Sequence, residues 1–338
     1  MNIEAVAKLA KVSTATVSRT INGTAKVSPE TAERVHRAIE ALNFYPDTNA
    51  RALGSGRSNL FGLIISDITN PFFPEIVKSF EDFAVANGQD VLISNTNYDS
   101  ERMKLCVRRM LQRRVDGVAI MTSEMDESLV TSFRRRHIPL VFLDSIAIGP
   151  GINCVRIDYT AGINAAVEHL TNLGHHRIAF ISGPLRLPSA RIRYKAFMES
   201  SARDHLDQNP HLMEEGNHRV EGGHEAMQRV LTSDAMPTAV LASNDLTAIG
   251  AMGAITEAGL RVPEDISVVG YDDIQLSAYT TPPLSTVRLP RAEIARSAFD
   301  ALLQAMQPGA SKPSSGKEYV VHPEFVARKS TGPAPKGH

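Results

Sequence analysis

The sequence predicts an α/β protein in which an N-terminal helix-turn-helix headpiece precedes a core of two doubly wound parallel sheets. Three observations support this class. The first 22 residues carry two short helical patterns separated by a tight turn. From residue 60 onward, short apolar runs alternate with amphipathic helical stretches, which is typical of βαβ units. The alternation occurs in two successive series, so the 338 residues are expected to form a headpiece and two lobes.

The headpiece is expected to span residues 1–46. Its first helix is indicated by apolar residues at helical spacing, namely Ile3, Val6, Leu9 and Ala10. Ser13 stands where an N-cap belongs, so a second helix is expected from Thr14 to about Asn22. Two helices this close must cross steeply, which is the helix-turn-helix arrangement. The outer face of the second helix presents Thr14, Ala15, Thr16, Ser18, Arg19 and Asn22.

A third helix should complete the headpiece core. Ser28 is its expected N-cap, Pro29 takes the first helical position, and Val35 and Ala38 follow on the inward face. Residues 1–57 carry eight Lys and Arg against five Asp and Glu, a net charge of +3, whereas the remainder carries 28 against 32, a net charge of −4. The positive charge is concentrated where DNA phosphates would be met. The alternative is an ordinary small helical subdomain.

Residues 47–59 are interpreted as a linker between two folding units. A helix-compatible segment at residues 48–53 lies within it, but so short a helix is not stable alone in water. We expect this segment to fold only against a partner. The alternative is a flexible tether in which Leu53 is incidental.

The core should contain two series of strands and helices. The first has strands at residues 60–66, 90–95, 116–121 and 140–144, and helices at 75–87, 101–114 and 127–137. The second has strands at 177–182, 238–243 and 266–271, and helices at 160–173, 190–205, 223–231 and 245–258. Later elements at 284–287, 291–306, 319–321 and 325–327 indicate that the chain crosses between the lobes more than once. We assign residues 60–158 and 289–318 to an N-lobe, 159–288 and 319–330 to a C-lobe, and 331–338 to a frayed tail.

Polar side chains gather at the expected carboxyl ends of strands, where doubly wound sheets bind ligands. They are Asp67, Asn70, Asp144, Asn244, Asp245, Asp272 and Asp273, with Phe72, Phe73, Arg191 and Arg193 on the segments that follow. Planar polar groups can bond adjacent hydroxyls, and an aromatic face can cover a sugar ring, so this set suits a polyhydroxylated ligand between the lobes. The alternative, strongest for Asp245 and Asp273, is that these residues cap helices or solubilise loops.

Composition and motifs argue against other classes. No apolar run approaches the ~20 residues that span a bilayer and no secretion signal is evident, so we expect a cytoplasmic protein without a membrane partner. A sugar-binding transport protein would need such a signal and no headpiece. Cys106 and Cys154 stand far apart and support neither a disulfide nor a zinc site. Nucleotide-binding, hydrolase and metalloprotease motifs are missing, so neither catalysis nor a cofactor is expected.

Several motifs occur together along nearly the whole chain. They are IEAVAKLA from Ile3, VSTATVSR from Val12, Asn22-Gly23, VSPET from Val27, NFYP from Asn43, ARAL from Ala50, GLII from Gly62 and NPFF from Asn70. Together they resemble the lactose-repressor/galactose-repressor (LacI/GalR) family of bacterial transcription regulators, whose core is like that of periplasmic binding proteins. A helix-turn-helix pattern alone would not identify this family.

The resemblance implies a repressor that binds palindromic operator DNA as a homodimer. No heptad repeat follows the core, so we expect a dimer without the tetramerising tail of some relatives. The segment around Ala50 and Leu53 would fold as a hinge helix in the minor groove, with Leu53 wedged into the central base step. The expected DNA-binding residues are Ser13, Thr14, Ala15, Thr16, Ser18, Arg19, Asn22, Ala50 and Leu53.

The resemblance also implies a small effector, a sugar or sugar derivative, in the cleft. Arg193 and Asp272 match the family's effector-binding arginine and aspartate, whereas Asn244 and Asp144 match less discriminating positions. His218 falls where some members place a ring-stacking tryptophan, and this chain has no tryptophan. The expected effector-binding residues are Asn70, Phe72, Phe73, Asp144, Arg193, His218, Asn244 and Asp272.

Overall fold

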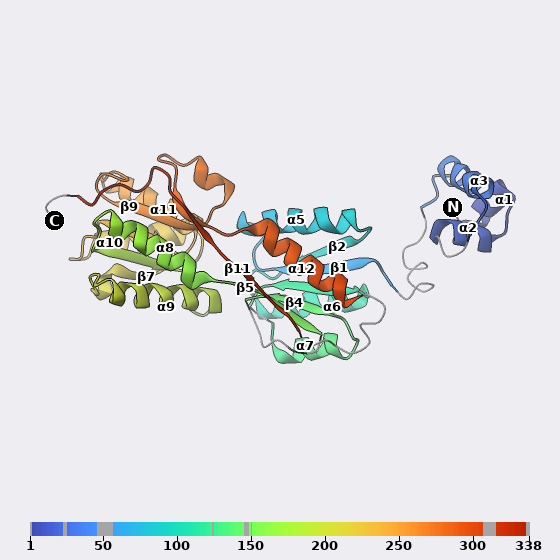
Figure 1. Ribbon diagram of the computed structural model, residues 1–338, viewed down its shortest axis with the longest axis horizontal. Coiled ribbons are helices and arrows are strands. Elements are labelled where there is room, and N and C mark those ends of the chain that lie inside the picture. The colour runs from blue at the N-terminus through green and yellow to red at the C-terminus, as the bar shows by residue number, and fades with distance from the viewer. Residues whose placement is uncertain are drawn as a thin grey trace. The chain divides into compact units, whose positions relative to one another are not determined.

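The computed structural model of the protein describes residues 2–22, 26–45, 57–123, 125–144, 149, 151–306 and 316–335. The chain forms two compact units, Met1–Leu60 and Phe61–His338 (Figure 1). Ala50 and Leu53, with the predicted helix at residues 48–53, lie outside the described residues. No helix in the described part of the chain is long and apolar enough to cross a membrane.

The headpiece has three helices, α1 (Ile3–Ala10), α2 (Thr14–Asn22) and α3 (Pro29–Ala41). Each start has a side-chain cap, which satisfies an amide that the helix itself leaves unpaired. Asn2 caps α1, Ser13 caps α2 and Ser28 caps α3. The steep turn between α1 and α2 is made possible by Lys11, whose φ of 55° is left-handed and ends α1.

The headpiece core is small and is shared by all three helices. Its buried side chains are Val6, Ala7, Ala10, Val17, Val35 and Ala38. Leu9 shares the apolar spacing of α1, yet 53% of its surface is exposed. The apolar stripe of α1 is therefore narrower than the sequence pattern indicates, because the buried face is centred on Val6 and Ala10.

The first lobe contains a six-stranded sheet in the order β11-β5-β4-β3-β1-β2. Its strands are β1 (Leu60–Ile65), β2 (Asp90–Asn95), β3 (Gly117–Met121), β4 (Leu140–Leu143), β5 (Ile152–Ile157) and β11 (Glu318–Val321). The sheet is covered by α5 (Phe72–Ala86), α6 (Ser100–Gln112), α7 (Glu127–Arg134) and α12 (Arg291–Ala305). Figure 1 shows α5 and α12 on one face and α6 and α7 on the other.

The second lobe contains a six-stranded sheet in the order β12-β10-β9-β8-β6-β7. Its strands are β6 (Ile178–Ser182), β7 (Met213–Glu215), β8 (Ala239–Ala242), β9 (Ser267–Asp272), β10 (Ser285–Arg288) and β12 (Glu324–Val326). The helices are α8 (Tyr159–Asn172), which packs on α9 (Pro188–Arg203), and α10 (Val220–Leu231), which packs on α11 (Asp245–Glu257). Short 3-10 turns, η1 (Pro210–Leu212) and η2 (Gln275–Ala278), complete the lobe.

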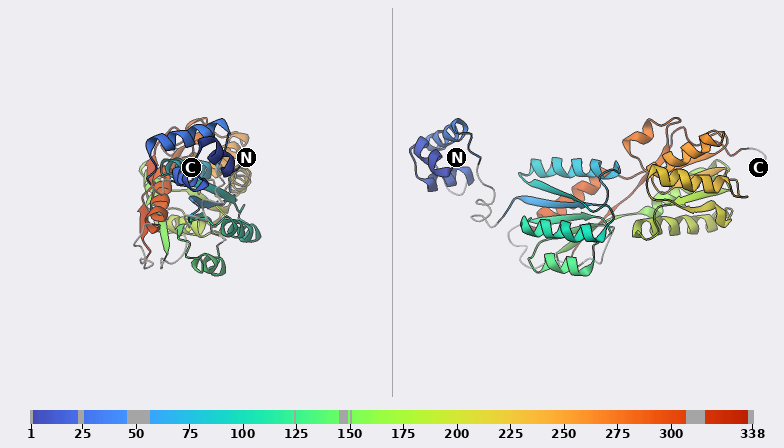
Figure 2. Two further views of the ribbon diagram at one scale, coloured as in Figure 1. Left: turned by 90° about the vertical axis from the view of Figure 1, so that its right-hand side faces the viewer. Right: turned by 180° about the vertical axis from the view of Figure 1, so that it is seen from behind.

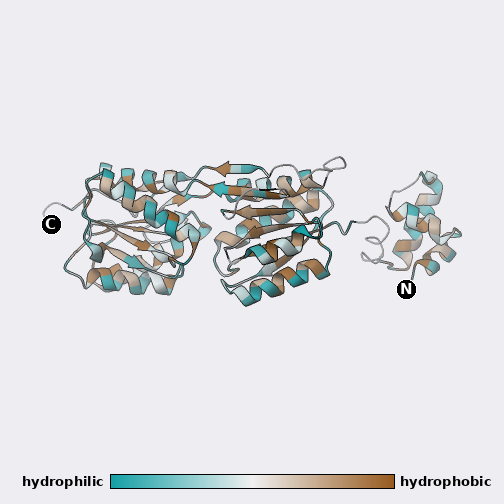
Figure 3. Ribbon diagram, turned by 90° about the horizontal axis from the view of Figure 1, so that it is seen from below, coloured by the Kyte–Doolittle hydropathy of each residue, from teal (hydrophilic) through white to brown (hydrophobic). Residues whose placement is uncertain are grey.

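Both sheets confirm the predicted α/β class with parallel strands. β10 and β12 pair antiparallel, whereas the other recorded pairs are parallel. Because helices cover both faces of each sheet, the central strands are apolar on both sides. Figure 3 shows these strands mostly in brown, with the hydrophilic teal gathered on the helices, and Figure 2 shows the same layering from behind.

The chain crosses between the lobes three times, after β5, after β10 and after β11. The predicted return to the second lobe at residue 319 is therefore too early. β11 pairs in parallel with β5 from Glu318 to Val321, so the first lobe keeps residues 319–321. Two strands, β5 and β7, were not predicted, because neither INCVRI nor MEE forms a continuous apolar run.

The predicted frayed tail from residue 331 is wrong for residues 331–335, which are attached to the second lobe. Ser330, just before them, is fully buried; its hydroxyl donates to the Val268 carbonyl at 2.6 Å and accepts from the Ser285 amide at 2.7 Å. The buried His175 ring lies 3.0 Å from the Gly332 carbonyl. These long-range polar contacts hold a segment that has no apolar pattern of its own.

Candidate DNA-reading surface and effector cavity

The outward face of α2 carries the predicted DNA-binding residues. Thr14, Ala15 and Arg19 are exposed, and Thr16 and Ser18 are partly exposed. No hydrogen bond or ion pair joins the Arg19 guanidinium to another described residue. A helix that presents a free arginine and small side chains in this way has the geometry with which helix-turn-helix proteins enter a major groove.

Two predicted contact residues also shape the turn before α2. The Ser13 hydroxyl accepts from the Thr16 amide at 3.1 Å and lies 2.9 Å from the Thr16 hydroxyl. Both side chains therefore stabilise the start of α2 within the headpiece itself. The Asn22 side chain lies outside the described atoms, so its predicted role stays a prediction.

A cavity of about 710 Å³, part of it open to solvent, lies between the two lobes of the core. All eight predicted effector residues line it, namely Asn70, Phe72, Phe73, Asp144, Arg193, His218, Asn244 and Asp272. They come from the carboxyl ends of strands in both sheets and from the helices that follow. A concave site with a few convergent polar groups beside aromatic side chains is typical of small-molecule sites.

Arg193 extends from α9 and is almost fully buried. Its Nη1 donates to the Ser243 carbonyl at 2.6 Å and its Nε to the Ser189 carbonyl at 3.2 Å. The guanidinium also lies over two aromatic rings, 5.0 Å from the centre of Tyr159 and 5.3 Å from that of Tyr271. These contacts fix the plane of the group while its Nη2 donates to no described residue, which leaves that nitrogen for a ligand.

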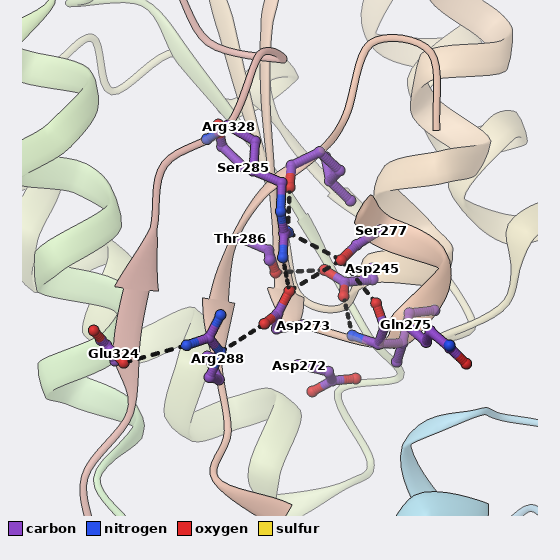
Figure 4. A network of polar contacts seen from close by, with 12 residues as sticks. Asp245, Asp272, Asp273, Gln275, Ser277, Ser285, Thr286, Arg288, Glu324 and Arg328 are labelled. Atoms are coloured by element: carbon purple, nitrogen blue, oxygen red, sulfur yellow. Dashed lines mark hydrogen bonds and ion pairs between the residues drawn. The ribbon is translucent and has the colours of Figure 1, made fainter. Parts of the chain in front are cut away.

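Asp272 ends β9 with a φ of 111°, which is unusual for a residue other than glycine. Burial raises the pKa of its carboxyl to about 7, although the guanidinium groups of Arg193 and Arg291 act in the opposite direction. Its carboxylate accepts no hydrogen bond from the described residues, and Figure 4 shows it apart from the neighbouring network. A buried carboxylate without partners is costly unless a ligand supplies hydrogen-bond donors.

The two neighbouring aspartates have structural partners (Figure 4). Asp245 accepts from the Thr286 hydroxyl at 2.5 Å and from the Ile274 amide at 2.7 Å. Asp273 forms ion pairs with Arg288 at 2.7 Å and Arg328 at 2.5 Å. Neither residue lines the cavity. Both residues therefore stabilise the second lobe through buried polar contacts, although neither caps a helix nor lies exposed on a loop.

Asp144 lines the cavity, but both of its carboxylate oxygens already accept hydrogen bonds. Oδ1 accepts from the Ile157 amide at 2.7 Å, and Oδ2 accepts from the Tyr159 hydroxyl at 2.5 Å. Ile157 ends β5 in the first lobe and Tyr159 begins α8 in the second, so Asp144 holds both ends of the first crossover. Burial raises the pKa of Asp144 to about 6.

Asn244 and His218 form a second fixed part of the wall. The Asn244 side-chain oxygen, Oδ1, accepts from the Thr247 backbone amide at 2.9 Å and so caps α11. Its side-chain nitrogen, Nδ2, donates to the His218 backbone carbonyl at 3.0 Å. Burial, helped by the positive charges of Arg193 and Arg186, lowers the pKa of His218 to about 3, so the ring is neutral. A Cβ at Gly183 would lie 1.8 Å from His218 Nε2, so any larger residue there would displace the ring.

The start of α5 supplies the aromatic side of the cavity. The Asn70 side-chain oxygen accepts from the Phe72 amide at 3.1 Å, which stabilises the start of the helix. The rings of Phe72 and Phe73 meet edge to face, with centres 5.2 Å apart. This arrangement presents apolar surface opposite the polar groups of the second lobe.

Several cavity residues were not predicted. They are Ser66, Tyr98, Met121, Thr122, Ser123, Leu143, Tyr159, Leu187, Pro188, Ser189 and Leu289. Met121, Thr122 and Ser123 could have been found, because Met121 ends the predicted strand at residues 116–121 and the other two follow it. Tyr159 could not, because it follows β5, which the sequence pattern did not reveal.

Polar contacts also join the two lobes outside the cavity lining. Asp67, after β1, forms an ion pair at 3.0 Å with Arg219, which precedes α10. The same guanidinium donates to the Asn97 side chain at 3.4 Å. On the crossover side, Arg291 pairs with Glu75 at 2.7 Å, while its guanidinium donates to the backbone of Asp272 and Asp273.

The fold and site define the class as a ligand-binding protein with two hinged lobes and a separate helix-turn-helix headpiece. No cluster of histidine, cysteine or carboxylate side chains suited to a metal ion occurs among the described residues. Known proteins agree with this class. The family described as bacterial regulatory proteins, lacI family, matches residues 2–47, and the periplasmic binding protein-like domain matches residues 167–331.

Similar proteins cover almost the whole chain. The HTH-type transcriptional repressor PurR of Haemophilus influenzae (strain PittEE) is 37% identical over 333 residues, which cover 97% of this chain and 98% of the relative. The lac repressor dimer bound to operator and the anti-inducer ONPF aligns with a TM-score of 0.86 at 33% identity, covering 98% and 99% of the two chains. The complex of the transcriptional regulator CelR with cellobiose aligns with a TM-score of 0.72 at 27% identity, covering 98% and 99%.

The chain therefore belongs to the lacI family of bacterial regulatory proteins and is a DNA-binding transcriptional repressor. Its relatives are transcriptional regulators rather than enzymes, in agreement with the expectation from the sequence.

Proposed function

We propose that operator binding by this repressor is controlled by a small polyhydroxylated effector, a sugar or sugar derivative, in the cavity between the lobes. The observation that carries the proposal is the pairing of two fixed, incompletely satisfied groups. Asp272 offers a carboxylate that accepts no hydrogen bond from the described residues, and Arg193 offers an Nη2 that donates to none of them. An acceptor and a planar donor in one wall are suited to adjacent hydroxyls of one ligand.

The opposite wall supports the same class of ligand. Phe72 and Phe73 present apolar ring surface that could cover the carbon face of a sugar. Asn70 adds an amide whose oxygen is used by the helix start, leaving its nitrogen as a donor. The cellobiose complex of a similar regulator is a precedent for a sugar in this fold.

The eight predicted effector residues divide into two proposed groups. Asp272, Arg193, Asn70, Phe72 and Phe73 would contact the effector directly. Asp144 and Asn244 would shape the wall, because their side-chain polar atoms hold the crossover, α11 and the loop before α10. His218 would join the first group, because its buried Nε2 has no hydrogen-bond partner among the described residues.

The proposed DNA contacts follow from exposure on α2. Arg19, Thr14 and Ala15 would meet base edges, while Ser13, Thr16, Ser18 and Asn22 would lie near phosphates. Ala50 and Leu53 would enter the minor groove at the operator centre. A palindrome of about 14–20 base pairs is expected for two headpieces.

A homodimer would supply the second headpiece. Both lobes present exposed apolar side chains that a second copy could cover. In the first lobe, Val85, Ile93 and Leu105 are exposed on and beside the edge strand β2, and in the second lobe Tyr279 is 75% exposed beside Leu276. An isologous contact of these faces fits symmetric DNA.

A thermal-shift screen of the full chain tests the effector class. The panel holds sugars, sugar phosphates and nucleobases, and a ligand that binds the folded state raises the melting temperature by mass action. We expect a sugar to stabilise the wild type and the same sugar, at the same concentration, to stabilise Asp272→Asn less. Stabilisation by nucleobases alone would reject the sugar class. Whether the nucleobase binds in the cavity would then be tested with the same Asp272→Asn variant.

A further inference from the structure

A strongly basic surface lies on the first lobe, at some remove from the effector cavity. Six exposed arginines form it, and we call them the arginine patch: Arg108, Arg109, Arg113, Arg114, Arg135 and Arg136. No hydrogen bond or ion pair joins any of these guanidinium groups to another described residue. Other cations of the same two helices are paired, Lys104 with Glu101 at 2.7 Å and Arg134 with Glu127 at 2.8 Å.

The patch is one surface because its two segments lead into neighbouring strands. α6 ends at Gln112 and the chain then enters β3, while α7 ends at Arg134 and the chain enters β4. The two strands pair directly, with Val118 opposite Leu140, and α6 packs on α7. Figure 1 shows both helices on the same face of the first sheet. The loop arginines therefore lie at the edge where these parallel strands begin.

The headpiece is attached at this same edge. β1 begins at Leu60, and its next residue, Phe61, pairs with Gly117 at the start of β3. Residues 46–59 connect this point to the end of the headpiece, and such a chain spans at most about 50 Å when fully extended. DNA held by the headpiece is therefore within reach of the arginine patch, whereas the cavity opens at the opposite edge of the sheet.

The composition of the patch indicates a phosphate ligand. A cation or two near the end of each helix would stabilise the helix dipole, but six unpaired arginines exceed that need. They occur in a part of the chain, residues 58–338, whose net charge is −4. Arginine presents a planar fork of donors that matches phosphate oxygens.

We propose that the arginine patch binds backbone phosphates of DNA flanking the operator, as a second DNA contact in addition to that of the headpiece. This contact is independent of sequence and lengthens the DNA footprint of the core. Because each neutralised phosphate releases counterions, it also makes binding to long DNA more dependent on salt.

The test compares two duplexes and two variants of the full chain. The operator is first selected from random duplexes by the wild type, then prepared as a 20-base-pair duplex and at the centre of a 60-base-pair duplex. The patch variant carries Arg113→Gln, Arg114→Gln, Arg135→Gln and Arg136→Gln. The control, matched in the number of charges removed, carries Lys195→Gln, Arg203→Gln, Arg261→Gln and Lys329→Gln. These are four exposed cations of the second lobe, and the first three form surface ion pairs.

We expect the patch variant to bind the 60-base-pair duplex about 10- to 100-fold more weakly than the wild type and with a shallower dependence on salt, since each lost phosphate contact reduces the logarithmic slope by about 0.9. Binding to the 20-base-pair duplex should be unchanged, which shows that the headpiece still reads DNA. Equal binding of the patch variant and the wild type to both duplexes would overturn the proposal and favour an acidic protein as the occupant. An equal loss in the control variant would also overturn it, because net charge alone would then explain the effect.

Discussion

At the scale of single residues, chemically identical side chains have different roles because their partners differ. Asp245 and Asp273 are buried with two or more donors each, and their carboxylates stabilise the second lobe. Asp272 is buried beside them, but its carboxylate accepts no hydrogen bond from the described residues. It ends β9 with a positive φ. A sequence pattern that selects all three positions cannot distinguish these roles, because the partners lie up to 55 residues away.

The first prediction concerns pH and Asp272. Its pKa is about 7 in the folded chain against an ordinary value of 3.8, so the folded state binds more protons between these values. The contribution of Asp272 to the free energy of unfolding therefore falls as pH rises through this window and is least favourable above pH ~7. We expect Asp272→Asn to raise the melting temperature of the ligand-free protein at pH 8 and to change it little near pH 4. Calorimetry at both values checks this, and a lower melting temperature at pH 8 would contradict it.

The same group gives a second prediction for effector binding. Hydroxyl donors bond the ionised carboxylate, so affinity for a sugar identified by the thermal-shift screen should rise from pH 6 to pH 8. Asp272→Asn should weaken binding by about tenfold or more, since stranding a ligand hydroxyl costs about 1–3 kcal/mol. It should also remove the pH dependence, as isothermal titration can measure. An unchanged pH profile in the variant would place the titrating group elsewhere.

A third prediction concerns Arg19, the free guanidinium on the outer face of α2. Arg19→Ala should weaken operator binding and relax the base preference at one position in each half-site, because a bidentate arginine–guanine contact is worth about 1–3 kcal/mol of discrimination. Selection from random duplexes by the variant measures this directly. If affinity falls equally for all sequences, Arg19 contacts a phosphate instead of a base.

At the scale of elements, the sequence pattern predicts central strands better than edges and crossovers. β1 and β3 are buried on both faces and appear as unbroken apolar runs, so their positions were predicted within one residue. β5 lies nearer the edge of the sheet and contains Asn153 and Arg156, so it does not form an unbroken apolar run. Because this strand was not predicted, Tyr159, which follows it in the chain, was not recognised as a cavity residue. The carboxyl ends of strands meet at one edge of a parallel sheet, which is why the eight predicted cavity residues gather although they span two hundred positions.

The ion pair between Asp67 and Arg219 joins two segments that belong to different lobes. It lies on the side of the sheets away from the crossovers, because β1 and β7 are far from β5 and β10 in the strand orders. The pair therefore opposes lobe opening. Half of the Arg219 side chain is exposed, so solvent screening limits the pair to about 1 kcal/mol or less.

We expect Arg219→Gln to accelerate effector dissociation by about twofold to fivefold, which corresponds to that energy. The control is Arg229→Gln, which removes a pair with Glu214 at 2.7 Å inside the second lobe alone. Stopped-flow measurement of dissociation of the sugar found in the screen should separate the two variants. The same rate in both would mean that the ion pair does not restrain the lobes.

At the scale of the whole molecule, residues 46–59 form the covalent connection between the DNA-reading headpiece and the effector-binding core. A ligand can change DNA affinity only by the difference in its binding free energy for the two lobe arrangements. If a short segment folds only on DNA, a difference of a few kcal/mol is enough to change how often that segment is folded. A helix of six residues has too few hydrogen bonds to be stable alone. We propose that the hinge segment is the place where a change in the core alters operator affinity without blocking any contact of α2.

The last prediction tests this hinge through Leu53. If Leu53 wedges into the central base step, Leu53→Ala should weaken specific operator binding at least about tenfold, because truncating a well-packed leucine costs about 2–5 kcal/mol. Nonspecific, salt-sensitive binding should change little, since the basic headpiece supplies it. Amide exchange at residues 48–53 should be fast in the free protein and slow on operator, with the effector shifting that protection. Equal protection with and without DNA would show that the hinge is a permanent helix and that coupling takes another route.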